Sequence, residues 1–168
     1  MNYCPQCGSE LVAGNIDGES RRVCSNEHCA YVFWNNPVPV VAALVELEGD
    51  YIIARNRSWP PGVFSVITGY LEQGEIPEDA VVREVSEELG LQGTVTRFIG
   101  NYLFREKNQL ILCYEVSASG TVETNHELAE IKRLSSAELS DYDFRPLYIT
   151  EQIIQEWKKH TNYAREEK

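Results

Sequence analysis

The segment that decides the fold is GYLEQGEIPEDAVVREVSEELGL, residues 69–91, whose second half has the pattern of a helix with defined ends. Pro77 suits the first helical position, where its missing N–H removes no intrahelical hydrogen bond. Gly90 suits the left-handed conformation that commonly follows the last helical residue. One face of this segment carries an apolar residue at every fourth position, namely Val81, Val85 and Leu89. We therefore expect an amphipathic helix over 77–89 that packs this stripe against a core.

Three glutamates of the same helix, Glu84, Glu87 and Glu88, share one side of it, because residues three and four apart lie on the same face. Like charges at these spacings repel each other. A divalent cation among them would remove the repulsion, and an all-oxygen ligand set favours Mg²⁺, Mn²⁺ or Ca²⁺ over zinc. The alternative interpretation is a solvated acidic face, which surface helices often have.

The spacing within residues 69–91 resembles the Nudix signature at each of its defining positions. These positions are Gly69, Glu75, Arg83-Glu84-Val85, Glu87-Glu88 and Gly90-Leu91. The resemblance implies an α/β fold, the Nudix α/β/α sandwich with a mixed sheet, in which this segment forms a loop–helix–loop. It also implies an enzyme that uses Mg²⁺ or Mn²⁺ to hydrolyse a diphosphate joining a nucleoside to another group.

The same resemblance assigns roles to individual residues. Glu84 and Glu88, together with Glu87, would hold the magnesium ion and belong to the catalytic set. Glu75 and Arg83 would form a structural ion pair that fixes the loop to the helix.

The composition indicates one ordinary domain with a small appendage. The chain has 168 residues and a formal net charge of −11, which disfavours nonspecific binding to nucleic acid or membranes. The sequence has neither a long apolar run nor a signal peptide at its N-terminus, so we expect a cytoplasmic protein without a membrane partner. A bound divalent metal would still allow an anionic substrate.

Four of the five cysteines lie in the first 29 residues, as CPQC over 4–7 and CSNEHC over 24–29. Two such pairs suit a tetrahedral Zn²⁺ site made of Cys4, Cys7, Cys24 and Cys29. Residues 1–34 are too few to bury a core, so the structural zinc would supply their folding energy. This module resembles the zinc ribbon of NADH-pyrophosphatase-like Nudix proteins. Two alternatives are a redox Cys-x-x-Cys and a site in which His28 replaces Cys29.

The main domain is expected over 37–165, after the two prolines at its start. Apolar and β-branched runs predict strands at 38–47, 51–55, 63–68, 93–105 and 110–116. An amphipathic helix is expected over 146–160 near the C-terminus.

Three residues are expected to bind substrate: Gly69, Tyr70 and Arg55. In NADH-pyrophosphatase-like proteins an aromatic side chain at the position of Tyr70 stacks on the adenine, so the resemblance implies that role here. Arg55 ends the predicted strand 51–55, in a region where the resemblance implies contact with substrate phosphate. Trp59 is expected to pack or to anchor its loop, and stacking on a base is the alternative. The sequence departs from the NADH pyrophosphatases at 101–108, which lacks their proline- and aromatic-rich array.

A later acidic residue, Glu127, matches the family's glutamate that precedes a core strand. It is a candidate fourth metal ligand or water-activating base, and Glu130 is the second candidate. Either would complete a catalytic set in which the helix glutamates hold the metal.

These features together predict hydrolysis of a dinucleotide or nucleotide-sugar such as NADH, ADP-ribose or FAD, with release of a nucleoside monophosphate. The alternative is a non-catalytic zinc-ribbon Nudix module that senses a nucleotide. RNA decapping would need a basic channel, which the net charge disfavours. The resemblance also implies a homodimer.

Overall fold

The computed structural model describes residues 1–166, with side chains described as far as His160. The chain divides into two compact units, Met1–Pro37 and a larger unit that begins at Val38. Each unit has its own sheet, and the two are described separately here.

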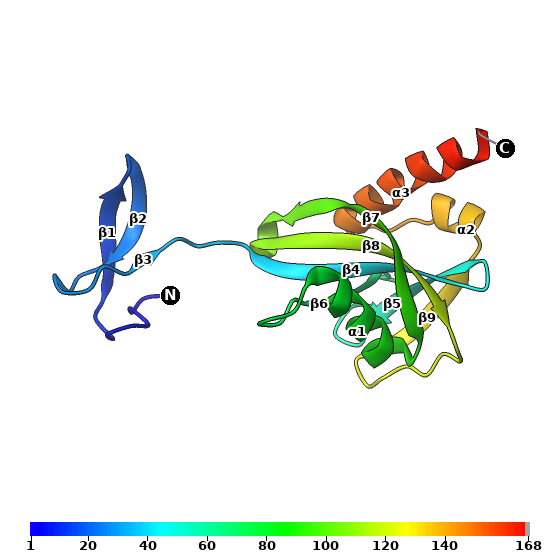
Figure 1. Cartoon of the computed structure of the whole chain (residues 1–168), viewed down its shortest axis with the longest axis horizontal. Helices are drawn as coiled ribbons and strands as arrows, with labels where there is room; N and C mark the ends of the chain where they lie inside the picture. The colour runs from blue at the N-terminus through cyan, green and yellow to red at the C-terminus, as the bar shows by residue number, and fades with distance from the viewer. Residues whose placement is uncertain (167–168) are drawn as a thin grey trace. The chain divides into compact units, whose positions relative to one another are not determined.

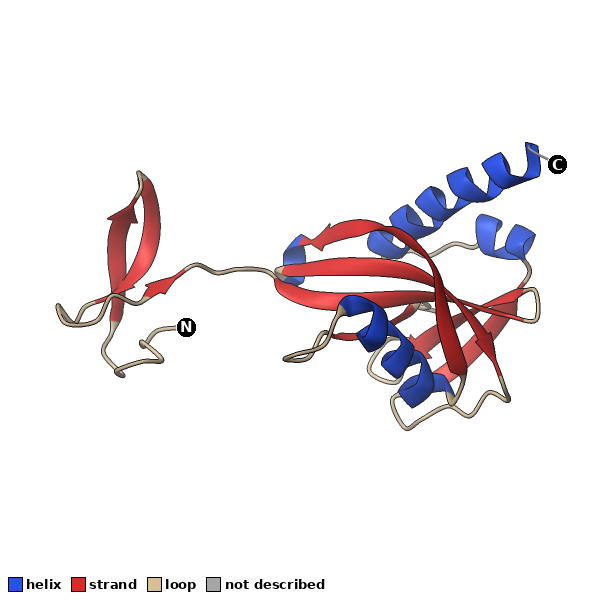
Figure 2. Cartoon of the chain, in the orientation of Figure 1, coloured by secondary structure: helices blue, strands red, loops and turns tan. Residues whose placement is uncertain are grey.

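The first unit is a small antiparallel sheet of three strands, in the order β1-β2-β3. The strands are β1 (Leu11–Ile16), β2 (Glu19–Cys24) and β3 (Val32–Phe33). Asp17 and Gly18 have positive φ angles of 52° and 88°, which suits the tight turn between β1 and β2. Figure 2 shows strands and loops but no helix in this unit. Within 1–37 the buried apolar side chains are Cys4 and Leu11, so packing alone gives this sheet little stability.

The second unit contains a mixed sheet of six strands in the order β7-β8-β4-β5-β9, with β6 paired to β4. The strands are β4 (Val38–Leu47), β5 (Asp50–Asn56), β6 (Ile67–Tyr70), β7 (Gln92–Phe104), β8 (Gln109–Ser119) and β9 (Leu128–Leu134). β4 and β8 are parallel, while the other pairs are antiparallel. A 3₁₀ turn, Arg105–Lys107, joins β7 to β8.

Helices cover both faces of this sheet, which gives the expected α/β/α sandwich (Figure 1). α1 (Pro77–Leu89) lies on one face, and α2 (Ser136–Asp141) and α3 (Tyr148–Glu166) lie on the other. β4 is buried on both faces, and its side chains alternate between two hydrophobic clusters. Val41, Ala43 and Val45 pack on the α1 side, and Val40, Ala42 and Leu44 pack on the α3 side. This explains why β4 is apolar without alternation.

α1 has the bounds expected from its sequence. Pro77 begins the helix, and Gly90 follows it with a φ angle of 68° and an N–H that donates to the carbonyl of Ser86. The apolar stripe faces the sheet, where Val81, Val85 and Leu89 are buried. The burial of this stripe fixes the rotation of the helix about its axis.

Several elements differ in their end residues from the sequence expectation, and two of these differences have a clear cause. The strand expected at 63–68 is displaced: β6 runs from Ile67 to Tyr70, because its pairing with β4 begins only there. Ser65 makes an isolated bridge with Ala54 instead. The C-terminal helix begins at Tyr148 rather than at 146, because Pro146 lies in the turn where Leu147 N–H donates to the carbonyl of Phe144.

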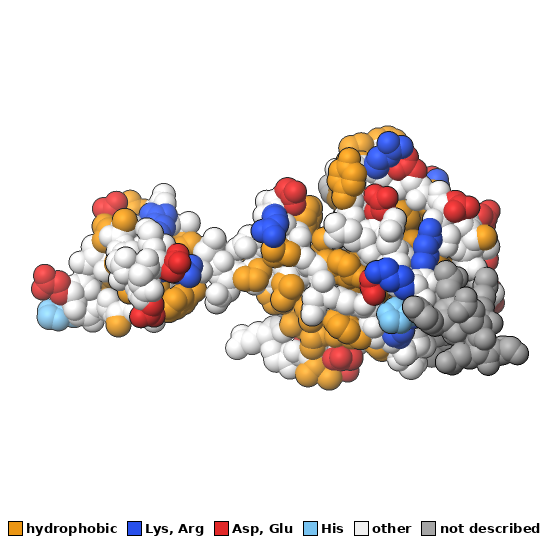
Figure 3. All heavy atoms as spheres, turned by 90° about the horizontal axis from the view of Figure 1, so that it is seen from above, with side chains coloured by type: hydrophobic (Ala, Val, Ile, Leu, Met, Phe, Trp, Pro, Cys, Tyr) orange, Lys and Arg blue, Asp and Glu red, His pale blue; other side chains and the backbone are white. Residues whose placement is uncertain are grey.

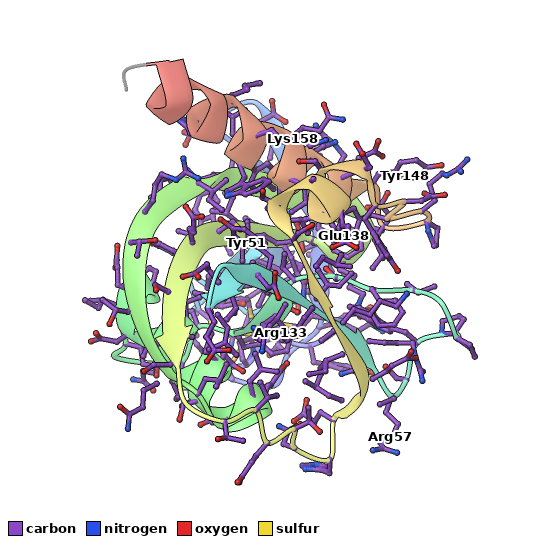
Figure 4. All side chains as sticks on the ribbon, turned by 90° about the vertical axis from the view of Figure 1, so that its right-hand side faces the viewer. Tyr51, Arg57, Arg133, Glu138, Tyr148 and Lys158 are labelled. Atoms are coloured by element: carbon purple, nitrogen blue, oxygen red, sulfur yellow. The ribbon has the colours of Figure 1, made fainter. Side chains whose placement is uncertain are left out.

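Glu115 of β8 links two other strands of the sheet, β5 and β7, with α3. Its Oε1 accepts hydrogen bonds from the Tyr51 hydroxyl at 3.2 Å and from Trp157 Nε1 of α3 at 2.9 Å. Its Oε2 lies 2.9 Å from a guanidinium nitrogen of Arg97. Figure 4 shows Tyr51 on the sheet beneath α2 and α3, and its ring packs edge-on against Trp157 at 4.8 Å. Burial and the nearby Glu115 raise the pKa of Tyr51 to about 12, so its hydroxyl remains a donor.

We expect Glu115→Gln to lower the free energy of unfolding by about 1–3 kcal/mol, because an amide cannot satisfy Arg97 and both neutral donors together. Urea denaturation followed by tryptophan fluorescence measures this. Glu48→Gln is the matched control, since Glu48 pairs with Arg133 at the exposed surface and should change stability by less than about 0.5 kcal/mol. Equal effects of the two substitutions would contradict the assigned role of Glu115.

Candidate active site

One cleft of about 430 Å³ gathers most of the residues that the sequence singled out. It is bordered by β6, α1, the β5–β6 loop and the first residue of β8. Its lining side chains include Asn56, Trp59, Thr68, Tyr70, Glu72, Arg83, Glu84, Glu87, Glu88, Lys107, Gln109 and Glu127. A smaller cavity of about 60 Å³ is also lined by Trp59, Glu88 and Glu127.

Glu88 is the most unusual side chain in the cleft. It is only 7 % exposed, and its carboxylate accepts no hydrogen bond from another residue within the described part of the chain. Burial raises its pKa to about 8, and the nearby charges of Glu84, Glu127 and Glu87 add to the shift. A buried carboxylate among three other acids is costly unless a cation joins it.

Glu84 has similar surroundings, but Arg83 offsets part of the unfavourable effect of burial on its charge. Burial raises its pKa, Arg83 opposes that shift, and the charges of Glu87 and Glu127 reinforce it. The oxygen donors of these four acids fit a hard cation such as Mg²⁺ or Mn²⁺. They line a common space but do not converge as tightly as the cysteines described below.

Arg83 is the centre of the hydrogen-bond network at the cleft. Its Nε and one terminal nitrogen donate to the two oxygens of Glu75, at 2.7 and 3.0 Å. The other terminal nitrogen donates to Glu84 at 2.7 Å and to Glu87 at 3.1 Å. A further bond of 3.1 Å reaches the carbonyl of Tyr70. These hydrogen bonds lower the pKa of Glu75 and raise the pKa of Arg83, so both groups stay charged.

Gly69 allows the close approach of β6 to α1. A Cβ atom built on Gly69 would overlap the carboxylate carbon and both oxygens of Glu84. The absence of a side chain therefore leaves room for Glu84 at the wall of the cleft. Tyr70, the next residue, projects its ring into the cleft and is 61 % exposed.

Glu127 and Glu130, the two acidic candidates after β8, have different surroundings. Glu127 lines the cleft, and its loop is held by Arg57, whose Nε donates to the carbonyl of His126 and whose terminal nitrogen donates to that of Leu128. Figure 4 shows Arg57 at the end of the sheet beside this loop. Glu130 pairs with Arg55 across β5 and β9 at 3.4 Å and does not line the cleft.

Arg55 lies outside the residues that line the cleft. Its Nε contacts Glu130, and a terminal nitrogen donates to the carbonyl of Trp59 at 3.2 Å. The structure brings Lys107 to the cleft instead. Of the cations that line the cleft, Arg83 is committed to the acids, whereas Lys107 has only a contact with the Phe104 ring among the described residues, at 5.7 Å.

The sequence assigns no site role to Lys107, Gln109 or Asn56, and for Trp59 it favours a structural role over stacking on a base. Lys107 lies in the turn between β7 and β8, and nothing in the local sequence pattern distinguishes it from a solvated turn residue. These residues reach the cleft only through the pairing of β4 with β8 and the path of the β5–β6 loop.

The second candidate site is the cysteine cluster of the first unit. The Sγ atoms of Cys4, Cys7, Cys24 and Cys29 all lie within 4.8 Å of one another, and none of the cysteines forms a disulfide. The distances of 3.7 Å for Cys4–Cys29 and 3.4 Å for Cys7–Cys24 are near the ~3.8 Å spacing of thiolates around tetrahedral zinc. His28 is not part of this group, which is the one set of such donors found close enough for a metal within the described residues.

Known proteins share sequence and fold with this chain. A family model described as NUDIX domain matches residues 36–153. The chain is 30 % identical over 132 residues to NAD(P)H pyrophosphatase NUDT13, mitochondrial, of Mus musculus, covering 77 % of this chain and 36 % of that protein. It is 27 % identical over 145 residues to NAD-capped RNA hydrolase NudC of Photorhabdus laumondii, covering 86 % and 53 %. The chain thus spans about a third to a half of the length of these relatives.

Solved structures share the fold. A NUDIX hydrolase from Nitrosomonas europaea superposes with a TM-score of 0.78 at 20 % identity, over 96 % of this chain and 93 % of that one. The Escherichia coli ORF135 protein superposes with a TM-score of 0.60 at 25 % identity, over 74 % of this chain and 90 % of that one.

We expect Gly69→Ala to weaken Mn²⁺ binding at least tenfold, because the new methyl group displaces the Glu84 carboxylate. Electron paramagnetic resonance of free Mn²⁺ gives the affinity, and a thermal melt reports any loss of folding. Gly62→Ala is the control: Gly62 has a φ angle of 88° but open space around its Cβ position, so the variant carries backbone strain without overlap. Mn²⁺ affinity that Gly69→Ala leaves unchanged would exclude Glu84 as a ligand.

For the cysteine cluster, we expect one zinc per chain by elemental analysis. Chelation should unfold residues 1–37 while the unit that begins at Val38 stays folded, because the first sheet has almost no buried core. Four thiols should then react with a thiol reagent, while buried Cys113 stays unreactive. Hydrogen exchange that remains unchanged in 1–37 after chelation would contradict this.

Proposed function

The chain belongs to the NUDIX domain family, and from that membership we propose that it hydrolyses the diphosphate of a nucleotide joined to another group. Attack by water would release a nucleoside monophosphate and a second phosphorylated product. The observation that carries the proposal is Glu88, a buried carboxylate without a hydrogen-bond partner among the described residues, in a cleft that also presents an exposed aromatic ring.

We assign the Mg²⁺ or Mn²⁺ site to Glu84, Glu87 and Glu88, with Glu127 as the fourth acid. When bound, the cation neutralises phosphate charge and makes water at the site more acidic. We propose that Glu127, on the loop that Arg57 holds, accepts the proton of the attacking water, with a helix glutamate as the alternative base.

The remaining residues of the cleft position the substrate. Arg83 and Glu75 keep the loop at the wall of the cleft, and Gly69 leaves room for Glu84. Tyr70 offers its ring to the base of the nucleotide. Lys107 is a further candidate for phosphate binding beside Arg55, because Lys107 lines the cleft and its ammonium group lies outside any ion pair of the described residues.

The substrate class we propose is a dinucleotide or nucleotide-sugar such as NADH, ADP-ribose or FAD. Relatives named for NAD(P)H and for NAD-capped RNA support a dinucleotide diphosphate. A small molecule is favoured over RNA because of the net charge of −11. In addition, the face shown in Figure 3 has its described basic side chains next to acidic ones rather than in a continuous stripe.

Three further properties belong to the same proposal. The cysteine cluster would hold a structural zinc, and its reduced thiols fit the cytoplasm. Within the described residues, no helix combines the length and the apolar character that a membrane span requires. A homodimer is the assembly that the resemblance implies.

A module that senses a nucleotide without cleaving it is the alternative. Release of a monophosphate from a panel of NADH, NAD, ADP-ribose, FAD and diadenosine polyphosphates with Mg²⁺ discriminates between the two. Hydrolysis of at least one compound is expected, and tight binding without turnover across the panel would favour the sensor.

We expect Glu88→Gln to lower kcat by two or more orders of magnitude, because it removes a metal ligand. Without metal, this variant should be at least as stable as the wild type at pH 8, since it removes a charge that burial opposes. Mg²⁺ should raise the melting temperature of the wild type but not of the variant.

Glu127→Gln should also lower kcat strongly. Glu130→Gln is the matched control and should keep kcat within about threefold, because Glu130 lies outside the cleft and pairs with Arg55. Near-normal turnover of both Glu88→Gln and Glu127→Gln would refute the metal and base assignments.

A further inference from the structure

Two side chains of the cleft meet across the beginning of β4. In the sheet, Tyr70 pairs with Val40 and Gln109 pairs with Val38. Because Val38 and Val40 are two residues apart on one strand, Tyr70 and Gln109 project from the same face. Nε2 of Gln109 donates a hydrogen bond to the hydroxyl of Tyr70 at 3.3 Å.

This contact fixes the amide of Gln109 at the edge of an exposed ring. Tyr70 is 61 % exposed, so a base can stack on its ring. Gln109 is half-buried and lines the same cleft. Because one N–H of the amide is bound to the Tyr70 hydroxyl, the carbonyl oxygen and the second N–H remain for a ligand. Within the described residues, no other hydrogen bond of this amide is found.

A neighbouring acceptor and donor match one kind of purine edge. Adenine presents an amino donor beside a ring-nitrogen acceptor, and an amide can satisfy both at once. Guanine and hypoxanthine carry a carbonyl oxygen at the same position, beside the N7 acceptor. When the amide meets the edge formed by position 6 and N7, its oxygen faces O6 of either 6-oxopurine, which is another acceptor, and loses its hydrogen bond.

We propose that Gln109 is a specificity-determining residue that selects adenine over 6-oxopurines in the nucleotide held on Tyr70. The proposal rests on the nucleotide hydrolysis proposed above and adds the identity of the base. Tyr70 supplies the stacking surface, which accepts any base, and Gln109 supplies the discrimination. The Tyr70 hydroxyl acts as a positioning group, since it holds the amide in place.

The test compares two substrates that differ only at position 6 of the purine, NADH and reduced nicotinamide hypoxanthine dinucleotide, with the full-length chain and Mg²⁺. The wild type should prefer NADH by about tenfold or more in kcat/KM, mainly through KM. Gln109→Leu should bring the ratio to within about twofold, mainly by raising KM for NADH. The affinities of AMP and IMP, measured by calorimetry, should show the same preference in the wild type and the same loss in the variant.

Two further variants distinguish a loss of base selectivity from a general loss of folding. Tyr70→Phe keeps the ring but removes the hydroxyl that holds the amide, so the NADH preference should fall while KM for hypoxanthine dinucleotide stays within about threefold. Gln152→Leu, in a groove beside α3, should leave the ratio unchanged. Circular dichroism checks that each variant is folded.

Separate outcomes would overturn the two proposals. A wild type that hydrolyses both dinucleotides within twofold of each other, or a Gln109→Leu variant that keeps the full preference, refutes the role of Gln109 and leaves the hydrolase assignment intact. A wild type that binds AMP tenfold more tightly than IMP but cleaves neither dinucleotide supports the role of Gln109 and refutes the assignment of dinucleotide hydrolysis.

Discussion

The guanidinium group of Arg83 is the interaction on which the site depends. It donates to both oxygens of Glu75, to Glu84, to Glu87 and to the carbonyl of Tyr70. A loop, a helix face and the end of a strand therefore meet at one planar cation with five N–H donors. A lysine would offer a point charge at this position but could not hold three elements in fixed directions. The position of the acids relative to the aromatic ring thus follows from the geometry of one side chain.

The core of the domain forces the site into an unfavourable arrangement. Val81, Val85 and Leu89 are buried against the sheet, and this fixes the rotation of α1. That rotation also buries Glu88, whose pKa rises to about 8 because of desolvation and neighbouring acids. A leucine or methionine would be more stable there without metal. Apolar packing thus positions the acids, and a bound cation would offset the cost of burying their charges. Such a locally unfavourable arrangement is typical of a functional site.

The sequence predicted those parts of the molecule that depend on local signals. The helix at 77–89 has a proline at its start and a glycine after its end, and both ends were correct. The strand expected at 63–68 was displaced, because β6 is defined by pairing with β4, and composition does not reveal that register. Lys107 and Gln109 could not be found as site residues for the same reason. They reach the cleft because β8 runs parallel to β4. Each residue of β4 pairs with a residue of β8 far along the chain, as Val38 does with Gln109, and such distant pairing leaves no trace in the sequence of the turn.

The register of β6 on β4 also explains how this short strand contributes to both the acidic and the aromatic parts of the cleft. Successive residues of a strand point to opposite faces, so Gly69 faces α1 while Tyr70 faces the other side. Gly69 must lack a side chain because Glu84 occupies the space of its Cβ, whereas Tyr70 must carry a large one to offer a stacking surface. A shift of one residue in the pairing of β6 with β4 would turn the tyrosine ring into the acids and the glycine toward Gln109. The pairing of this four-residue strand therefore holds the acidic and the aromatic parts of the cleft in a single geometry, and neither part can be repositioned without the other.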